Sequence, residues 1–331
     1  MYGVDYPVVV RREKQIPRCA RDDILGALSF RAMRSGARNL LLVAAGRCAR
    51  REVGSWYYAG IEIMVFENKV KKLLAQGKAA WGAGLLDSSL LMAKFTVNTG
   101  IDFLWMDTEH GVYGLESIAM VPVICRLHGC VPMVRVATLD AGLIKKALDI
   151  GASAVMIPQV SNAAEARLAV RYSKYPPEGI RGVSPIWTMF MDVSYSDYLP
   201  AANDETCVIV QVETPEGIEN LEAIAEVEGV DVVFAGPSDL AASLGYIGQN
   251  THPVVQKFLE DFPRRVAKAG KSSGISLAGF EACRKAFEQG YRFICIGHIL
   301  LQGHLGLTAD LIQLRENAAR LDGESAEKPS T

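Results

Sequence analysis

The sequence lacks the patterns that mark several common classes of protein. Its seven cysteines form no CxxC pair, and their odd number argues against a zinc–thiolate site and a disulfide framework. The five histidines show no HExxH or similar ligand spacing. No run of about 18 uncharged apolar residues is present, so we expect no membrane span. We expect a protein of a reducing compartment, the cytoplasm.

An excess of charge of one sign is also lacking. The formal net charge of -2 gives no strong field for nucleic acid or an anionic membrane, and we expect neither as a partner. No glycine-rich phosphate loop stands out. With 331 residues, 50% of them hydrophobic, the chain can bury a large core. One barrel domain of roughly 250 residues with additional segments fits this length.

The two ends of the chain differ from its middle. Residues 1–66 are rich in arginine and poor in acids, and we treat them as an N-terminal extension of unknown role. The stretch 24–45 is compatible with a basic helix, with an organelle-targeting peptide or with a segment irrelevant to the chemistry. Asp22 and Asp23 weaken the targeting interpretation without excluding it. Residues 319–331 form a polar C-terminal tail, of which we expect 323–331 to be disordered.

From residue 67 onward, short apolar stretches alternate with helical patterns. Eight stretches rich in valine and isoleucine are predicted strands, at 80–85, 101–106, 131–136, 154–157, 207–212, 230–234, 273–277 and 293–296. Helical patterns lie at 68–76, 141–150, 163–172, 217–226, 253–269 and 279–289. Such alternation predicts a parallel sheet covered by helices. Eight units in one domain predict closure into a (β/α)₈ TIM barrel over residues 67–318.

Polar side chains follow several of the predicted strands at the point where barrel enzymes carry their chemistry, the carboxyl ends. Asp107 and His110 follow one strand, Arg135 lies near the end of the next, and Glu213 and Asp239 follow two later ones. We expect these five side chains to converge on one rim of the barrel.

Two carboxylates at one rim can hold a divalent cation. Mg²⁺-like ions take oxygen ligands and often need only one or two protein carboxylates, so Glu213 and Asp239 are candidate metal ligands. The alternative is that each one caps a helix at a strand-to-helix turn. Gln211 points the same way along the strand as Glu213, and either binds a metal-bound water or fills the barrel interior. Glu109 is expected to face away from the rim, into an ion pair.

This set of side chains suits the formation of a carbanion next to a carbonyl group. A divalent metal chelated by a 2-oxo acid acts as a Lewis acid and stabilises the enolate. The guanidinium of Arg135 adds fixed positive charge where negative charge develops on the keto oxygen. His110, oriented by Asp107, is the candidate acid/base group, because imidazole titrates near neutrality.

Two further segments are candidate substrate contacts. The turn formed by Gly236, Pro237, Ser238 and Asp239 leads into a helix, and its backbone N–H groups could hold the substrate carboxylate. The connection between residues 157 and 207 is too long for a plain βα unit and contains Trp187 among several aromatics. We expect Trp187 to contact substrate; the alternative is that these aromatics pack a subunit interface.

Several motifs, taken together and in order, resemble those of the HpcH/HpaI family of metal-dependent (class II) 2-oxo acid aldolases. They are Asp107-Thr108-Glu109-His110, Val134-Arg135, residues 144–152, residues 175–182, Gln211-Val212-Glu213-Thr214 and residues 229–240. The resemblance spans about residues 67–314. It implies a TIM barrel of the phosphoenolpyruvate/pyruvate type whose last helix is exchanged between partners, in a homo-trimer or homo-hexamer.

The resemblance also implies roles for individual residues. Glu213 and Asp239 would ligate Mg²⁺, Mn²⁺ or Co²⁺, with no organic cofactor. Arg135 would bind the 2-oxo oxygen, and His110 with Asp107 would take the proton of the C4 hydroxyl. Cleavage of the C3–C4 bond of a 4-hydroxy-2-oxo acid would then give an aldehyde and a pyruvate enolate, with no Schiff-base lysine.

Two other activities stay open at this point. An oxaloacetate decarboxylase, or a carbon–carbon bond-forming enzyme of the macrophomate synthase type, would use the same enolate, and a non-catalytic, metal-stabilised binding protein is a remote third possibility. The sequence departs from the family pattern at Ser184, where a glycine is common, and at Ser238, where alanine is usual. These departures leave the identity of the aldehyde open.

Overall fold

The computed structural model describes residues 51–52, 55–58, 61–64 and 66–326. The predictions for 24–45, including the basic or targeting helix, lie outside these residues. Three short strands, β1 (Arg51–Glu52), β2 (Ser55–Tyr58) and β3 (Ile61–Met64), form one sheet in that order.

Eight parallel strands close into a barrel, as the alternating pattern predicted. They are β4 (Ala80–Leu85), β5 (Phe103–Asp107), β6 (Val131–Arg135), β7 (Ala154–Ile157), β8 (Cys207–Val212), β9 (Val232–Ala235), β10 (Ser272–Ser276) and β11 (Phe293–His298). Strand β11 pairs with β4 and thereby closes the ring. The predicted strand bounds at 80–85, 154–157 and 207–212 match the observed ones, and the others differ by one or two residues at one or both ends.

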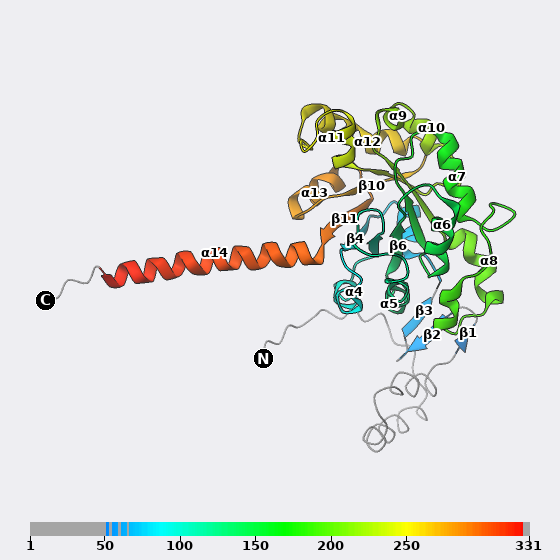
Figure 1. Cartoon of the computed structure of the whole chain (residues 1–331), viewed down its shortest axis with the longest axis horizontal. Coiled ribbons are helices and arrows are strands. Elements are labelled where there is room, and N and C mark those ends of the chain that lie inside the picture. Colours follow the sequence, from blue (N-terminus) through cyan, green and yellow to red (C-terminus); the bar gives the residue numbers. More distant parts are fainter. Residues whose placement is uncertain (1–50, 53–54, 59–60, 65, 327–331) are drawn as a thin grey trace, which may run out of the picture. The chain divides into compact units, whose positions relative to one another are not determined.

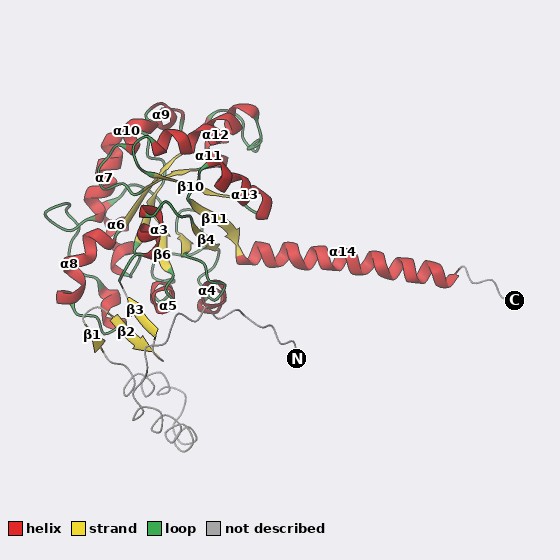
Figure 2. Cartoon of the chain, turned by 180° about the vertical axis from the view of Figure 1, so that it is seen from behind, coloured by secondary structure: helices red, strands yellow, loops and turns green. Residues whose placement is uncertain are grey.

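Helices surround the strands, which lie at the centre of the barrel in Figures 1 and 2. They are α3 (Lys69–Ala75), α4 (Leu90–Val97), α5 (Val121–Leu127), α6 (Ala141–Asp149), α7 (Ala163–Ser173), the 3₁₀ helix η2 (Ile186–Phe190), α8 (Tyr195–Glu205), α9 (Pro215–Glu219), α10 (Leu221–Ala225), α11 (Pro237–Ser243), α12 (Pro253–Ala267) and α13 (Phe280–Gln289). The last helix, α14 (Ile299–Ala326), projects away from the barrel (Figure 1). The single helix predicted at 217–226 is two short helices, because Asn220 ends α9 and begins α10.

Local capping explains where several helices begin. The side chain of Asn162 accepts a hydrogen bond from the backbone N–H of Glu165, at 3.1 Å, and starts α7. Glu165 in turn accepts a hydrogen bond from the backbone N–H of Ser161, at 2.7 Å, so the first turn has few unpaired donors. Helix α13 ends at Gly290, whose φ of 109° is the left-handed conformation that glycine tolerates best.

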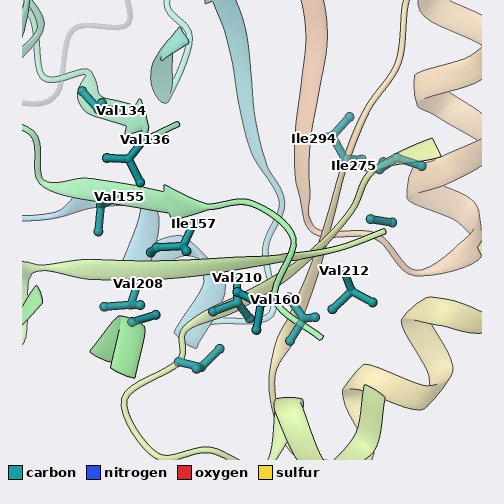
Figure 3. Close-up of a cluster of buried hydrophobic side chains, with 14 of the residues drawn as sticks. Val134, Val136, Val155, Ile157, Val160, Val208, Val210, Val212, Ile275 and Ile294 are labelled. Carbon is teal, nitrogen blue, oxygen red and sulfur yellow. The ribbon is translucent and has the colours of Figure 1, made fainter. Parts of the chain in front are cut away.

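The core consists of two apolar layers on opposite faces of the sheet. The outer layer lies between strands and helices and includes Val134, Val155, Val210 and Ile294, part of which Figure 3 shows. The inner layer fills the barrel with aromatic and aliphatic side chains. There Phe103 stacks on Phe293 with ring centroids 4.0 Å apart. Barrels filled in this way are packed cores and not pores.

Helix α3 closes the amino-terminal end of the barrel. Its Val70 is fully buried in the inner layer, and Leu73 and Leu74 pack against the same cluster. The side chain of Asn68 fastens this helix by donating hydrogen bonds to the carbonyl oxygens of Ser153, at 2.8 Å, and Glu205, at 3.0 Å. With this end covered, the carboxyl ends of the strands are the accessible mouth of the barrel.

Helix α14 follows β11 directly and has an unusual surface. Every side chain from Leu300 to Ala318 is exposed, although the helix is rich in leucine. It extends to Ala326, through part of the polar tail 319–331 and into the segment 323–331 that we expected to be disordered. No helix in the described part of the chain is long and apolar enough to cross a bilayer.

Candidate active site

The carboxyl ends of four strands bring most of the predicted polar side chains to one rim. Asp107 ends β5 and lies opposite Arg135, which ends β6, in the strand register. Gln211 lies near the end of β8, and Glu213 follows that strand directly. Asp239 lies in the first turn of α11, just after β9. The convergence expected from the sequence is therefore present.

Arg135 is held from three sides. Its Nε and one terminal nitrogen donate to the two carboxylate oxygens of Asp107, at 2.9 and 2.6 Å. The other terminal nitrogen donates to Oε1 of Gln211, at 3.3 Å, and lies 3.0 Å from Oε2 of Glu109. The guanidinium also lies 4.8 Å from the centre of the Trp105 ring. Since the side chain is only 7% exposed, its charge has a fixed position.

Asp107 pairs with Arg135, and not with the imidazole of His110 as we expected. Its Oδ1 accepts backbone hydrogen bonds from Glu109, at 3.1 Å, and His110, at 3.4 Å, so it shapes the loop as well. Burial raises the pKa of Asp107, but the hydrogen bonds and charge of Arg135 outweigh burial and leave it below its ordinary value. The His110 side chain is 63% exposed, and its Nε2 lies 3.9 Å from Oε2 of Glu109.

Glu109 faces the rim, which sequence reasoning missed. Its side chain is 11% exposed and forms an ion pair with Arg135. Burial raises the pKa of Glu109, while the charges of Arg135 and His110 lower it. The charges of Asp107 and Asp239 raise it further, and the net pKa is above its ordinary value. The influence of Asp239 places Glu109 near the candidate metal ligands. Its position next to His110 in sequence was the only available signal.

Glu213 is a buried acid among other acids. It is 2% exposed, and its carboxylate accepts hydrogen bonds from the backbone N–H of Gln159, at 3.1 Å, and from the side-chain amide of Gln211. Burial raises the pKa of Glu213 to about 7; the Gln211 hydrogen bond opposes this change, and the charge of Asp239 adds to it. Gln211 thus bridges Glu213 and Arg135 at the rim.

Neither Glu213 nor Asp239 is the N-cap of a helix, so the capping alternative does not explain them. Helix α9 is capped by Thr214, whose Oγ1 accepts from the backbone N–H of Gly217 at 3.0 Å. The N-cap position of α11 is occupied by Gly236, and Asp239 lies within the first turn with its side chain exposed.

Gly236 allows the backbone of this turn to approach Glu213 closely. A Cβ atom at this position would lie 2.2 Å from Oε2 of Glu213 and 2.7 Å from Nε2 of Gln211. No larger residue fits there without moving the carboxylate. Pro237 and Ser238 follow as the first residues of α11, and the hydroxyl of Ser238 accepts a hydrogen bond from Asn250 at 3.0 Å.

Trp187 does not lie at the rim of its own chain. It is fully buried in η2, 3.9 Å from the guanidinium of Arg126, and its ring packs edge-on against Tyr198. It also packs against Gly151, where an added Cβ would lie 2.9 Å from the Cβ of Trp187. Gly151 precedes β7, at the amino end of the barrel, so Trp187 lies outside the candidate site. Its size and its loop position suggested function, but it packs the base.

The rim suits a divalent cation. Glu213 is ionised with difficulty because it is buried and because Asp239 repels its charge, and a bound cation would remove both penalties. Across residues 66–318, no group of three or more His, Cys, Asp and Glu side chains is arranged to hold a metal ion. A cation here would therefore take two protein carboxylates, with water and substrate completing its oxygen ligands, as Mg²⁺-like ions often do.

A closed (β/α)₈ barrel with paired carboxylates and a fixed arginine at its mouth defines an enzyme-like site for a small, oxygen-rich anion. Residues 85–298 match the family model described as HpcH/HpaI aldolase/citrate lyase. The chain belongs to this family.

Individual relatives agree with the assignment. The chain is 39% identical to a 4-hydroxy-2-oxovalerate aldolase of Rhodococcus jostii over 75% of this chain and 97% of that protein. It is 38% identical to a hydroxypyruvate/pyruvate aldolase of Pseudomonas aeruginosa over 77% of this chain and 93% of that protein. A crystal structure of a family member from Burkholderia cenocepacia superposes with a TM-score of 0.71 at 32% identity, covering 75% of this chain and 99% of that chain.

Proposed function

We propose that this protein is a divalent-cation-dependent pyruvate aldolase, which cleaves or forms the C3–C4 bond of a 4-hydroxy-2-oxo acid. The observation that carries the proposal is a pair of carboxylates on one rim: Glu213, which is buried and has a raised pKa, and Asp239. The fixed guanidinium of Arg135 lies on the same rim. Family membership and the aldolase relatives support the reaction class.

The cation that Glu213 and Asp239 would hold is Mg²⁺, Mn²⁺ or Co²⁺, and it supplies Lewis-acid stabilisation of the enolate. Arg135 contributes a second, permanent positive charge towards the 2-oxo oxygen. Because Asp107 and Gln211 already fix its guanidinium, little reorganisation is needed when negative charge develops there. The backbone N–H groups of the turn from Gly236 to Asp239 would bind the substrate carboxylate, since Gly236 brings this turn next to Glu213.

We assign proton transfer at the C4 hydroxyl to His110. Its ring is the exposed imidazole of the rim, and the adjacent carboxylate is Glu109, not Asp107. The distance of 3.9 Å between Nε2 of His110 and Glu109 suits an electrostatic influence on the ring more than a fixed hydrogen bond. Glu109 therefore acts on both His110 and Arg135, while Asp107 positions Arg135.

The activity is tested by two separate reactions. Exchange of the pyruvate methyl protons with deuterated water reports enolate formation alone, and cleavage of 4-hydroxy-2-oxo acids reports the complete reaction. Both should require Mg²⁺, Mn²⁺ or Co²⁺ and stop in EDTA. Arg135→Ala should slow exchange roughly 10²- to 10³-fold, the scale for loss of one charge-stabilising donor. Full exchange in EDTA, or in the Arg135 variant, would contradict the proposal, and turnover of oxaloacetate alone would favour a decarboxylase.

We also propose that α14 packs on a second copy of the chain, in a trimer or hexamer. Seven large apolar side chains of this helix are exposed, namely Leu300, Leu301, Leu305, Leu307, Leu311, Ile312 and Leu314. A surface of this kind on one helix marks a protein contact.

We place the enzyme in the cytoplasm, because the cysteines at 125, 130, 207, 283 and 295 are all free.

A further inference from the structure

The last strand of the barrel contains a bulge that turns a histidine towards the mouth. Cys295 of β11 pairs with Gly82 of β4, but the next pair is His298 with Gly84, so three steps along β11 match two along β4. Gly297, with a φ of 88°, adopts the left-handed conformation that such a bulge uses. Simple alternation from the inward-facing Cys295 would have pointed His298 outward. The bulge reverses its direction.

A glycine on the neighbouring strand makes room for the imidazole. A Cβ atom at Gly84 would lie 2.2 Å from Nδ1 and 2.4 Å from Cε1 of His298, so the ring covers this position closely. Within residues 66–318, Nδ1 of His298 is buried and has no hydrogen-bond partner. Trp105, the register partner of Gly84 on β5, has a buried Nε1 that also has no partner among those residues. Two unpaired ring nitrogens thus flank β4.

These nitrogens lie on the two strands next to β4, three strands from β8 in either direction, and the centre of the Trp105 ring also lies 4.8 Å from the Arg135 guanidinium. In the closed strand order, β4 is four strands away from β8, which delivers Glu213, and is therefore opposite to it. If the 2-oxo acid end of the substrate binds at Glu213, Asp239 and Arg135, its other end points towards β4 and β11. That end contains C4 and the substituent that leaves as the aldehyde.

We propose that His298 determines which aldehyde the enzyme uses, by hydrogen bonding to a hydroxyl group on the carbon next to the aldehyde carbonyl. Trp105 is level with His298 in the strand register, because both pair with Gly84. A hydroxyl both donates and accepts, so it can satisfy an imidazole nitrogen and an indole N–H together, whereas a methyl group leaves both unpaired. A site built to bind a hydroxyl discriminates strongly against the analogue without one. This inference rests on the proposed aldolase function.

Glycolaldehyde and propanal provide the test, because they differ only in a hydroxyl and a methyl group of similar size. Both are condensed with pyruvate by the full-length protein with Mg²⁺, and kcat/KM is measured for each. The wild type should prefer glycolaldehyde. His298→Leu should lower the ratio of the two kcat/KM values roughly 10- to 100-fold, the scale for leaving a buried polar group unpaired. His298→Asn should keep part of the preference, since it keeps a hydrogen-bonding side chain.

Two further variants separate this role from a structural one. Gly84→Ala pushes the ring away from β4 and should lower the same ratio, mainly through KM for glycolaldehyde. His128→Gln is the matched control, because His128 is exposed at the end of α5, where its ring contacts only the backbone of Ile124 and the side chain of Lys94 among the described residues. That control should leave the ratio at its wild-type value.

The outcomes distinguish this inference from the proposed function. If the wild type does not exchange the pyruvate methyl protons, the aldolase assignment fails. If exchange occurs but His298→Leu slows both aldehydes equally, or leaves their ratio unchanged, the aldolase assignment stands and the role of His298 is refuted. A ratio that falls in His298→Leu and Gly84→Ala, and is partly kept in His298→Asn, supports it.

Discussion

Cation binding should depend on pH through Glu213. The cation needs the ionised carboxylate, and the pKa of this group is raised to about 7 in the folded chain, mainly by burial. Between pH 8 and pH 6 the ionised fraction falls about tenfold, so the Kd for Mn²⁺ should rise about tenfold over the same interval. Titration calorimetry at several pH values measures this change. At pH 7, each bound cation should release about half a proton.

The same pKa predicts how the cation-free protein responds to pH. A raised pKa in the folded state favours folding at low pH, and that contribution is lost as pH rises through the folded pKa. Raising the pKa from 4.5 to about 7 corresponds to about 3 kcal/mol of destabilisation above pH 7. In EDTA at pH 8, Glu213→Gln should therefore raise the melting temperature by several degrees, and the difference should disappear near pH 4.

Glu222→Gln is the matched control for both measurements. Glu222 pairs with Arg265 at 2.6 Å, and that hydrogen bond lowers its pKa to about 2, far from the window of interest. This variant should leave the pH profile of Mn²⁺ binding unchanged. A wild-type Kd that is equal at pH 6 and pH 8, or a Glu213→Gln variant that binds Mn²⁺ with the wild-type profile, would refute the assignment of Glu213 as a buried metal ligand.

Three other variants test separate parts of the structure. Asp107→Asn removes the charged partner of Arg135 and should lower kcat roughly 10²-fold with little change in Mn²⁺ affinity; an unchanged kcat would show that Arg135 needs no such support. Trp187→Ala should lower the free energy of unfolding by roughly 3–5 kcal/mol, measured by urea unfolding, and leave kcat/KM near the wild-type value. A selective rise in KM for the aldehyde at unchanged stability would show that Trp187 contacts substrate. Leu305→Glu, on the exposed surface of α14, should reduce the mass found by sedimentation, and an unaltered assembly would exclude that helix from the interface.

Much of the barrel could be predicted from sequence because its strands are short, apolar and bounded by helix signals. The segment at 207–212 was predicted correctly, since a buried parallel strand is a continuous apolar run and its end is marked by Glu213 and the cap at Thr214. The rim residues were found for the same reason, since parallel strands all end on one side. The prediction of one helix at 217–226 was less accurate, because Asn220 ends α9 and begins α10.

The errors concern features that depend on three-dimensional neighbours. Asp107 can reach either His110 or Arg135, and only the pairing of β5 with β6 decides for Arg135. Glu109 has no sequence signal that distinguishes an inward from an outward ion pair. Trp187 reaches the base of the barrel because Gly151 leaves space for it there.

The inward turn of His298 is a further feature that alternation could not predict. Strict alternation from Cys295 points the wrong way, and the bulge that corrects it is visible in sequence only as a single glycine, Gly297. Many glycines in this chain serve other purposes, so that signal is too weak to use without the structure.

The aromatic layer beneath the rim has a kinetic consequence. Because Phe103 and Phe293 fill the barrel interior and α3 covers its far end, reactants can enter and products can leave only through the mouth. We expect the keto acid, bound next to the buried Glu213 as proposed above, to depart after the aldehyde. An ordered release of this kind makes pyruvate a competitive product inhibitor of cleavage and the aldehyde a noncompetitive one.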